Sequence, residues 1–209
     1  MINYFLFPII GYLLGSIPTA VWLGRLKYGT DIREHGSKNA GATNTFRVLG
    51  KKPGIVVLMI DILKGYMATL LPWLLAGSAL APDDVIDIQI LTALTCVLGH
   101  VFPVYVGFNG GKGVATSLGV IIGLHSGAAG FAVLAFLLVY LSFSYVSLGA
   151  IVAAFAFPIF VIFVFQVSSL NLMIFSAILG LAVILAHWKN IFRLLNGTES
   201  KMPLLKKKE

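Results

Sequence analysis

Three polar stretches carry the residues of this chain that could do chemistry, and apolar segments separate them. The first stretch, GSKNAGATNTFR at residues 36–47, combines two glycines and several hydroxyl and amide side chains with Lys38 and Arg47. The backbone N–H groups of such a loop can turn inward while its side chains donate to anion oxygens. A solvated loop has a similar composition, so the residues alone leave a phosphate site and an ordinary loop equally open.

The second stretch, GHVFPVYVGFNGGKGVAT at residues 99–116, places Lys112 among three glycines directly before an expected helix. These glycines are Gly110, Gly111 and Gly113. Backbone amides, a helix N-terminus and a lysine can then share one anion. The stretch is not a nucleotide-binding GxxxxGK[ST] loop, because Val106 stands where the first glycine is needed and a glycine follows the lysine. A tight turn would explain one or two glycines, so three around a lysine favour a phosphate site.

The third stretch, HWKNIFRLLNGTE at residues 187–199, lies where the last apolar segment ends. His187, Asn190 and Arg193 are spaced i, i+3, i+6 and would form one polar stripe on a helix. Trp188 and Lys189 are typical of a membrane exit and are interpreted as interface anchors. Anchoring does not account for His187 and Asn190, which are therefore candidates for the site.

Two further polar features fall within or beside apolar segments. Asp61 and Lys64 are spaced i, i+3, which predicts a buried ion pair that is either aimed at the phosphate site or purely structural. Ser147 stands at the start of an expected helix, where a serine is usually an N-cap. The residues alone therefore favour a capping role for Ser147.

The composition indicates that membrane helices must position these stretches. Of the 209 residues, 58% are hydrophobic and 11% are charged, whereas soluble domains have about 25% charged residues. Seven helices of about 20 residues would use about 140 positions and leave no separate soluble domain. We predict an all-α, polytopic bundle of seven transmembrane helices in a single domain, residues 1–209. The net charge of +7 then marks cytoplasmic loops rather than nucleic-acid binding, and the single cysteine, Cys96, is expected to be a buried packing residue.

Seven apolar segments are the predicted spans. They are Tyr4–Leu23, Gly54–Leu75, Val85–Val106, Val114–Leu124, Gly127–Leu141, Val146–Phe165 and Leu170–Ala186. The first is expected to be a retained helix, because no basic region precedes it. The fourth and fifth are short, and two crossings are favoured over one re-entrant hairpin.

Basic residues predict the orientation of the spans. Those of the first loop are Arg25, Lys27, Arg33, Lys38, Arg47, Lys51 and Lys52, and those of the C-terminal tail are Lys189, Arg193, Lys201, Lys206, Lys207 and Lys208. The loops at residues 76–84, 125–126 and 166–169 carry no Lys or Arg. Seven crossings then place the N-terminus outside, and the C-terminus and all three polar stretches at the cytoplasmic face.

Glycines with small-xxx-small spacing predict close contacts between helices. They are Gly11 and Gly15 in one segment, and Gly119, Gly123 and Gly127 in another region. On their own these glycines are packing faces and not sites.

The three polar stretches, in this order and separated by apolar spans, resemble the three motifs of the bacterial membrane glycerol-3-phosphate acyltransferases that use acyl-phosphate as donor. The resemblance covers essentially the whole chain, including GSIPTA at residues 15–20 and DILKG at residues 61–65. It implies acyl transfer from a long-chain acyl-phosphate to the 1-hydroxyl of sn-glycerol 3-phosphate, giving lysophosphatidate and phosphate, the first step of phospholipid synthesis. It also implies seven spans in the bacterial inner membrane, an active site facing the cytoplasm, no metal and no cofactor.

The resemblance also implies roles for individual residues. The catalytic candidates are Ser37, Arg47, Lys112, Ser147, His187 and Asn190. The candidates for binding substrate and phosphate are Lys38, Asn39, Asn44, Lys64, Gly110, Gly111, Gly113, Arg193 and Glu199. The expected partners are the two substrates, membrane lipid and an enzyme that produces acyl-phosphate, with no nucleic acid.

An acyl-phosphate is already activated, so such an enzyme needs positioning, charge neutralisation and an oxyanion donor. In our hypothesis Lys112 and Arg47 hold phosphate, and Ser37 and Asn39 orient it. Either Asn190 or Ser147 donates to the developing oxyanion. The proton goes to His187 or to a substrate phosphate oxygen, and the sequence leaves both open.

Other chemistries fit the sequence less well. Covalent serine catalysis lacks its GxSxG motif, and no histidine is followed five residues later by an aspartate, as in the HxxxxD acyltransferases. The alternative from another class is a small anion transporter, which needs ionisable groups along a path through the membrane. Asp61 and Lys64 are the ionisable residues expected at depth, which favours the acyltransferase.

Overall fold

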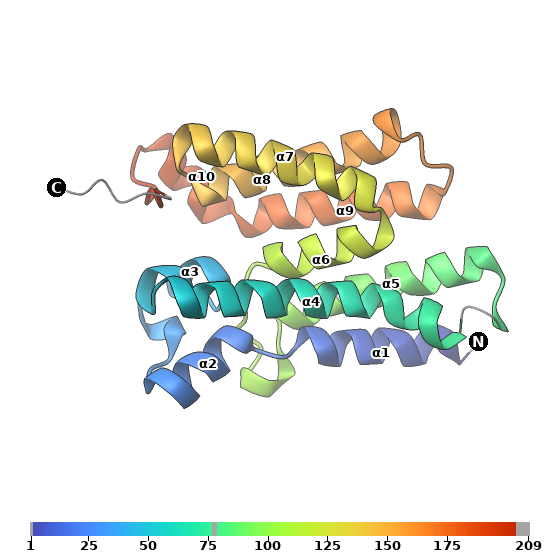
Figure 1. The fold of residues 1–209 in the computed structure, drawn as a ribbon, viewed down its shortest axis with the longest axis horizontal. Coiled ribbons are helices and arrows are strands. Elements are labelled where there is room, and N and C mark those ends of the chain that lie inside the picture. Colours follow the sequence, from blue (N-terminus) through green and yellow to red (C-terminus); the bar gives the residue numbers. More distant parts are fainter. Residues whose placement is uncertain (1, 77–78, 204–209) are drawn as a thin grey trace. The chain divides into compact units, whose positions relative to one another are not determined.

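The computed structural model describes residues 2–76 and 79–203, and helices joined by loops make up this part of the chain. The chain divides into two compact units, Met1–Ser126 and Gly127–Glu209. Figure 1 shows the order of the helices in each unit. The predicted all-α class is confirmed for the described residues.

Eight helical elements form the first unit. They are α1 (Asn3–Gly15), α2 (Thr19–Tyr28), η1 (Ile32–Glu34), α3 (Ala42–Val48), α4 (Lys51–Ala76), α5 (Pro82–Val101), η3 (Val104–Val106) and α6 (Val114–Leu124) among the described residues. The long helix α4 is the centre of this unit, since it packs against α1, α3, α5 and α6 (Figure 1). The first polar stretch covers the loop before α3 and most of α3, and the second runs from the end of α5 to the first turn of α6.

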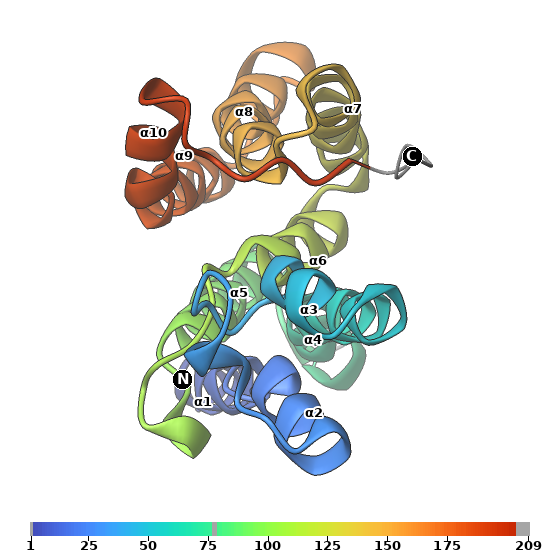
Figure 2. The ribbon, with the colours of Figure 1, turned by 90° about the vertical axis from the view of Figure 1, so that its left-hand side faces the viewer.

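The second unit contains α7 (Ser126–Phe143), α8 (Val146–Ile159), η4 (Phe160–Val164), α9 (Leu170–Ala186) and α10 (Trp188–Leu195). Helix α8 packs against α9, and α10 contacts both. After α10 the chain runs back across the start of α8 toward α7 (Figure 2). Two hydrogen bonds fasten it there: Met202 N–H donates to Ser144 O at 2.9 Å, and Tyr140 OH donates to Met202 O at 2.7 Å.

Five helical segments in the described ranges are long and apolar enough to cross a membrane, and a sixth is added if the pair α9 and α10, bent by 57°, counts as one span. Helix α6 has 11 residues, and a helix of that length extends about 16 Å, roughly half the hydrocarbon thickness of a bilayer. Helices of membrane-spanning length are therefore confirmed. The count of seven crossings and the orientation of the termini stay predictions.

The first predicted span, Tyr4–Leu23, is not one helix: α1 ends at Gly15 and α2 begins at Thr19. Pro18 explains the break, because proline lacks an N–H and disfavours helical geometry in the residue before it. At the break the Ile17 carbonyl accepts from the Thr19 N–H at 3.0 Å instead of from a donor one helical turn further on. Lys64 Nζ of α4 donates to this oxygen at 2.9 Å, so the buried lysine compensates for the interruption.

The predicted glycine packing faces are confirmed at four positions. A Cβ on Gly15 would overlap the backbone of Cys96 in α5, and one on Gly11 would lie 2.8 Å from Thr92 Cγ2. On α6, a Cβ at Gly119 would overlap Ile62 O, and one at Gly123 would overlap Thr69 Oγ1. These glycines let α1 approach α5, and α6 approach α4, at backbone distance. Cys96 is buried, as predicted.

This packing predicts a stability difference between two Gly→Ala variants. Gly15→Ala is expected to destabilise the protein by about 2 kcal/mol, because the added methyl meets backbone that cannot rotate away. Gly130→Ala in α7 is the matched control, since nothing lies within 4 Å of its added Cβ, and a helical alanine is expected to stabilise by about 0.5–1 kcal/mol. Thermal unfolding in detergent measures both. Equal midpoints for the two variants would contradict the packing.

Candidate active site

The first polar stretch, residues 36–47, was expected to be a loop throughout, but only residues 36–41 form one and residues 42–47 belong to α3. We call the whole stretch the polar loop. It lies over a core cluster that joins α2, η1, α3 and α4 and consists of Ala20, Val21, Ile32, Ala40, Ala42 and Val57. Asn44 is buried beneath the loop and shapes it: its Oδ1 accepts from Ser37 N–H at 2.8 Å, and its Nδ2 donates to Ile32 O at 2.9 Å and to His35 O at 3.0 Å. Asn44, a predicted phosphate-binding residue, therefore organises the loop in this structure.

Most of the predicted ligands in the polar loop point outward. Ser37, Lys38 and Arg47 are exposed, and Asn39 is half-buried. Lys38 has a left-handed backbone with φ of 59°, which marks a tight turn where the loop presents its side chains. The loop thus offers a serine hydroxyl and two cationic side chains on a surface that the Asn44 amide holds in shape.

The second polar stretch includes the segment 104–113, which we call the glycine–lysine loop. Gly110 N–H donates to Val101 O and Gly111 N–H donates to His100 O, both at 3.1 Å. A Cβ on Gly110 would overlap His100 O, and one on Gly111 would overlap His100 Nε2. These two glycines therefore bring the loop against the end of α5, and in this structure their N–H groups bond to α5 carbonyls.

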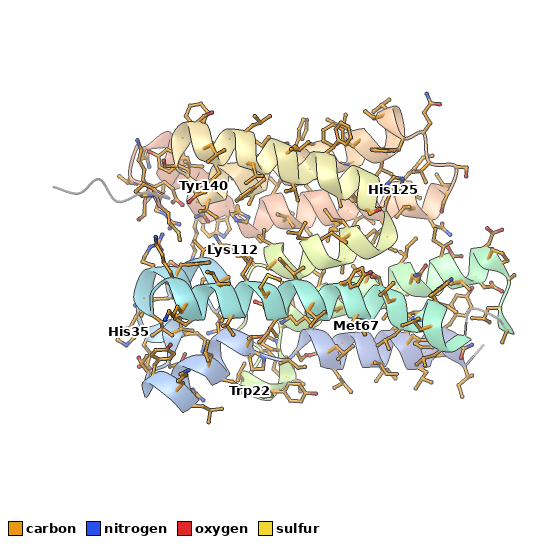
Figure 3. All side chains as sticks on the ribbon, viewed as in Figure 1. Trp22, His35, Met67, Lys112, His125 and Tyr140 are labelled. Atoms are coloured by element: carbon orange, nitrogen blue, oxygen red, sulfur yellow. The ribbon has the colours of Figure 1, made fainter. Side chains whose placement is uncertain are left out.

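Gly113 and Lys112 lie where this loop enters α6. Gly113 has φ of 78° and occupies the N-cap position of α6. The half-buried Lys112, labelled in Figure 3, directly precedes it. An ammonium group beside the N–H groups of a first helical turn has the chemistry of an anion site.

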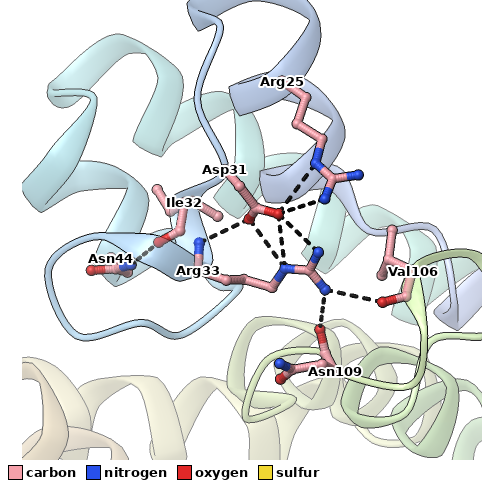
Figure 4. A network of polar contacts seen from close by, with 7 residues as sticks. All are labelled: Arg25, Asp31, Ile32, Arg33, Asn44, Val106 and Asn109. Carbon is pink, nitrogen blue, oxygen red and sulfur yellow. Dashed lines mark hydrogen bonds and ion pairs between the residues drawn. The ribbon is translucent and has the colours of Figure 1, made fainter.

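A network of charged residues that the sequence did not indicate joins α2 and η1, which precede the polar loop, to the glycine–lysine loop (Figure 4). Asp31 accepts from Arg25 Nη2 and from Arg33 Nη2, both at 2.8 Å. The second terminal nitrogen of Arg33, Nη1, donates to Val106 O at 3.0 Å and to Asn109 O at 3.2 Å. The Arg33 guanidinium holds the pKa of the Asp31 carboxyl well below its usual range, with a further contribution from Arg25.

The predicted ion pair of α4 is present, since Lys64 Nζ lies 2.9 Å from Asp61 Oδ1 and both side chains are buried. Thr19 Oγ1 donates to the same oxygen at 3.1 Å, and His100 Nδ1 of α5 lies 3.8 Å from it. Lys64, a predicted phosphate ligand, bonds here to Asp61 and to Ile17 O. His100 was not predicted, because its approach to Asp61 depends on how α4 and α5 pack.

In the second unit, the Glu199 carboxylate accepts hydrogen bonds from three predicted site residues. Its Oε1 accepts from Ser147 Oγ and from Asn190 Nδ2, each at 2.7 Å, and its Oε2 accepts from Arg193 Nε at 2.6 Å. Burial alone would raise the pKa of Glu199, but these three donors hold it below its usual value. The predicted stripe of Asn190 and Arg193 on α10 is therefore used to bind one carboxylate.

Ser147 does not cap α8, so the capping role favoured by the sequence is wrong. The N-cap position belongs to Tyr145, which makes no side-chain cap hydrogen bond. Ser147 follows within the first turn and its hydroxyl donates to Glu199 instead. The chain that returns after α10 brings the Glu199 carboxylate to this hydroxyl, which donates a charge-assisted hydrogen bond to it.

His187 is buried at the bend between α9 and α10. Its Nδ1 lies 2.7 Å from Val183 O. A carbonyl oxygen only accepts, so Nδ1 carries the proton of the neutral ring and Nε2 is the atom able to take another. This tautomer suits either a general base or an acceptor for a substrate hydroxyl.

Within residues 2–76 and 79–203, no group of three or more His, Cys, Asp and Glu side chains could hold a metal ion. The described residues offer hydrogen-bond donors and charge: cationic loops in the first unit, and in the second a serine, an asparagine and an arginine that donate to one carboxylate.

Comparisons with known proteins agree on one family. A family model for glycerol-3-phosphate acyltransferase matches residues 5–197. A glycerol-3-phosphate acyltransferase of Fusobacterium nucleatum is 42% identical over 198 residues, which cover 95% of this chain and 97% of the relative.

Solved structures give the same result. PlsY (YgiH), an integral membrane glycerol 3-phosphate acyltransferase, matches in its glycerol 3-phosphate form with a TM-score of 0.86 and 38% identity over 96% of each chain. Its lysophosphatidic acid form matches with a TM-score of 0.82 and 36% identity, over 96% of this chain and 95% of that one. By sequence motif, family model and fold, this chain belongs to the glycerol-3-phosphate acyltransferase family.

Proposed function

We propose that this protein transfers an acyl group from a long-chain acyl-phosphate to the 1-hydroxyl of sn-glycerol 3-phosphate. The observation that carries the proposal is the match, over 96% of both chains, to a protein solved in a glycerol 3-phosphate form. The cationic groups of the polar loop and the glycine–lysine loop suit a reaction in which both substrates carry phosphate. The products are lysophosphatidate and inorganic phosphate.

The reaction balances without a cofactor. The hydroxyl oxygen attacks the acyl carbonyl carbon, the bond from that carbon to the phosphate oxygen breaks, and phosphate leaves with the electron pair. The hydroxyl proton passes to a base. Because phosphate is already a good leaving group, the protein has to position the substrates, neutralise their charge and stabilise the oxyanion.

The first unit supplies the phosphate-binding groups in this proposal. Lys112 and Arg47 neutralise phosphate oxygens, with Lys38 adding charge, while Ser37 and Asn39 orient them. Among the glycines, Gly113 at the start of α6 is the better amide donor, since Gly110 and Gly111 already donate to α5 carbonyls. Asn44 and Lys64 then act by shaping the polar loop and the α1–α2 break.

The second unit supplies the groups for acyl transfer. Asn190 Nδ2 and Ser147 Oγ both donate to Glu199 Oε1, each at 2.7 Å, so the carboxylate places two side-chain donors next to each other. Either Asn190 or Ser147 donates to the oxyanion. Arg193 and Glu199 orient these donors through their own ion pair of 2.6 Å.

The base is either His187 or an oxygen of a substrate phosphate, and His187→Ala decides between them. If His187 takes the proton, its loss lowers kcat by about 100-fold or more and removes the acidic limb of the pH–rate profile. If a phosphate oxygen takes it, kcat stays near the wild-type value. The second result, together with loss of activity in Lys112→Ala, would exclude the histidine base.

The proposed setting is the bacterial cytoplasmic membrane, with seven spans in a single domain and the active site open to the cytoplasm. One substrate is a lipid and the other is water-soluble, so such a site has to lie where the bilayer meets the cytoplasm. An enzyme that produces acyl-phosphate is then a functional partner.

Purified protein in lipid tests the proposal when glycerol 3-phosphate is offered with palmitoyl-phosphate or with palmitoyl-CoA. Lysophosphatidate is expected from palmitoyl-phosphate alone. Product from palmitoyl-CoA alone would overturn the donor assignment. Product from neither donor in a folded sample would favour the small anion transporter, which anion flux into proteoliposomes would then measure.

A further inference from the structure

We infer that Arg33 is a positioning residue for glycerol 3-phosphate binding, because it holds the glycine–lysine loop at a fixed distance from the polar loop. The inference rests on the proposed function for its kinetic consequence. The contacts from which it is argued all lie within the first unit.

Asp31 fixes the plane of the Arg33 guanidinium before any loop contact is made. Asp31 Oδ1 accepts from Arg33 N–H at 3.0 Å and from Arg33 Nε at 3.1 Å, and Oδ2 accepts from Arg33 Nη2 at 2.8 Å. The Arg33 side chain is 15% exposed and that of Asp31 is 9% exposed. With two nitrogens held by the carboxylate, the direction of the third, Nη1, is set by the planar fork.

Nη1 then binds the glycine–lysine loop through two backbone carbonyls, Val106 O at 3.0 Å and Asn109 O at 3.2 Å (Figure 4). These carbonyls flank two residues in the left-handed region, Gly107 with φ of 72° and Phe108 with φ of 59°. A bulky residue such as phenylalanine is disfavoured in that conformation. Arg33 therefore stabilises a turn that the backbone alone disfavours.

The position of this turn matters because Arg33 and the turn are each close in sequence to a predicted phosphate-binding segment. Lys112 is three residues beyond Asn109, and the polar loop begins three residues after Arg33. The Arg33 side chain thus helps to set the separation between the two proposed phosphate-binding segments of the first unit, together with Val106, which packs against the core cluster under the polar loop. A phosphate that contacts both segments would bind less tightly if that separation varied.

Arg25 provides a matched comparison within the same network. It donates to Asp31 from Nη2 at 2.8 Å and from Nε at 3.2 Å, and its side chain is 55% exposed. In the described part of the chain its side-chain hydrogen bonds go to Asp31 alone. A variant of Arg25 therefore changes the hydrogen bonding of Asp31 without touching the glycine–lysine loop.

Arg33→Lys and Arg25→Lys test the inference in the full-length protein with palmitoyl-phosphate as donor. A lysine has its donors on a single nitrogen and lacks the planar fork with which Arg33 holds Asp31 through Nε and Nη2 and the two carbonyls through Nη1. Arg33→Lys is therefore expected to raise KM for glycerol 3-phosphate about tenfold or more, with kcat changed far less. Arg25→Lys is expected to stay within about twofold of wild type. Equal changes in both variants, or an unchanged KM in Arg33→Lys, would overturn the inference.

Hydrogen–deuterium exchange of the amides in residues 104–113 gives a second readout that needs no activity. Arg33→Lys is expected to speed exchange there while α4 and α5 keep wild-type rates, and Arg25→Lys is expected to match wild type. Faster exchange throughout the first unit would show a general structural role instead. Asp31→Asn keeps Arg33 but removes the charge that orients its guanidinium. It is expected to raise KM and to speed exchange in residues 104–113, each by less than Arg33→Lys does. This variant replaces Arg33→Lys if the latter does not fold.

The two readouts separate this inference from the proposed function. If wild type makes no lysophosphatidate from either donor, the proposed function fails while the exchange data still decide whether Arg33 holds the loop. If wild type is active and Arg33→Lys alters neither KM nor exchange, the positioning role fails and the function stands.

Discussion

Lys112→Ala is expected to lower kcat/KM for glycerol 3-phosphate by about 100- to 1,000-fold. The reason is that a preorganised cation stabilises bound phosphate groups, whose negative charge is concentrated on a few oxygens. Both substrates and the leaving group carry phosphate. Lys112 is half-buried directly before α6, so no other lysine can take its place without moving the loop. Initial rates of lysophosphatidate formation at varied glycerol 3-phosphate measure the effect.

Lys52→Ala is the matched control, because Lys52 is an exposed lysine at the start of α4 and its loss changes the net charge equally. It is expected to stay within about twofold of wild type. Lys112→Arg keeps the charge with a different donor geometry and is expected to retain part of the activity. If both alanine variants lose the same small amount, Lys112 contributes only long-range charge and the proposed site is wrong.

Glu199→Gln is expected to reduce both stability and activity. Glu199 accepts from Ser147 and Asn190 at Oε1 and from Arg193 at Oε2. A glutamine side chain has one oxygen and an NH2 group that only donates, so it cannot accept at both positions. Hydrogen bonds to a charged group are each worth about 1.5–3 kcal/mol, and Arg193 is 43% exposed, so its ion pair is screened by water. A loss on the order of 2 kcal/mol follows, together with a lower kcat, because Asn190 is no longer oriented.

The pH dependence of this effect has a defined sign. The pKa of Glu199 is lowered by folding, so its contribution to stability is complete above the unfolded pKa of about 4.3 and is lost as the pH falls through the folded value. Thermal midpoints of wild type and Glu199→Gln are therefore expected to differ at pH 7 and to converge at acid pH. Asp83→Asn, at an exposed acid in the first turn of α5, controls for the loss of one charge. A difference that persists unchanged below pH 4 would exclude the carboxylate as its source.

Features that depend on neighbouring residues in one helix could be predicted from the sequence. The Asp61–Lys64 pair forms because i, i+3 positions share a helix face. The glycines of α1 and α6 lie at close helix contacts because their spacing places them on one side of each helix. Apolar length likewise indicated segments long enough to cross a membrane, which the described residues contain at Asn3–Tyr28, Lys51–Ala76, Pro82–Val106, Ser126–Phe143 and Val146–Val164.

Features that depend on how loops fold back could not be predicted. The roles of Gly110 and Gly111 follow from their contact with His100, which requires the end of α5 and the loop to meet. Ser147 looked like a cap because its partner, Glu199, is far away in sequence and is carried to α8 by the chain after α10. The contact of Arg33 with two backbone carbonyls leaves no trace in residue types at all.

The α1–α2 break lies between these cases. Pro18 was visible in an apolar run, but proline in a membrane helix is often tolerated when its neighbours satisfy the freed backbone groups. Here the Ile17 carbonyl accepts from Thr19 N–H at 3.0 Å and from Lys64 Nζ at 2.9 Å. Knowing the lysine partner requires the packing of α4 against the first two helices.

The most direct test of the central claim follows two products in one sample of the purified protein with palmitoyl-phosphate and glycerol 3-phosphate. Inorganic phosphate and lysophosphatidate are expected to appear in equal amounts, at rates that depend on glycerol 3-phosphate and that fall together in Lys112→Ala. Phosphate released without lysophosphatidate, or lysophosphatidate formed at an unchanged rate in Lys112→Ala, would contradict the account.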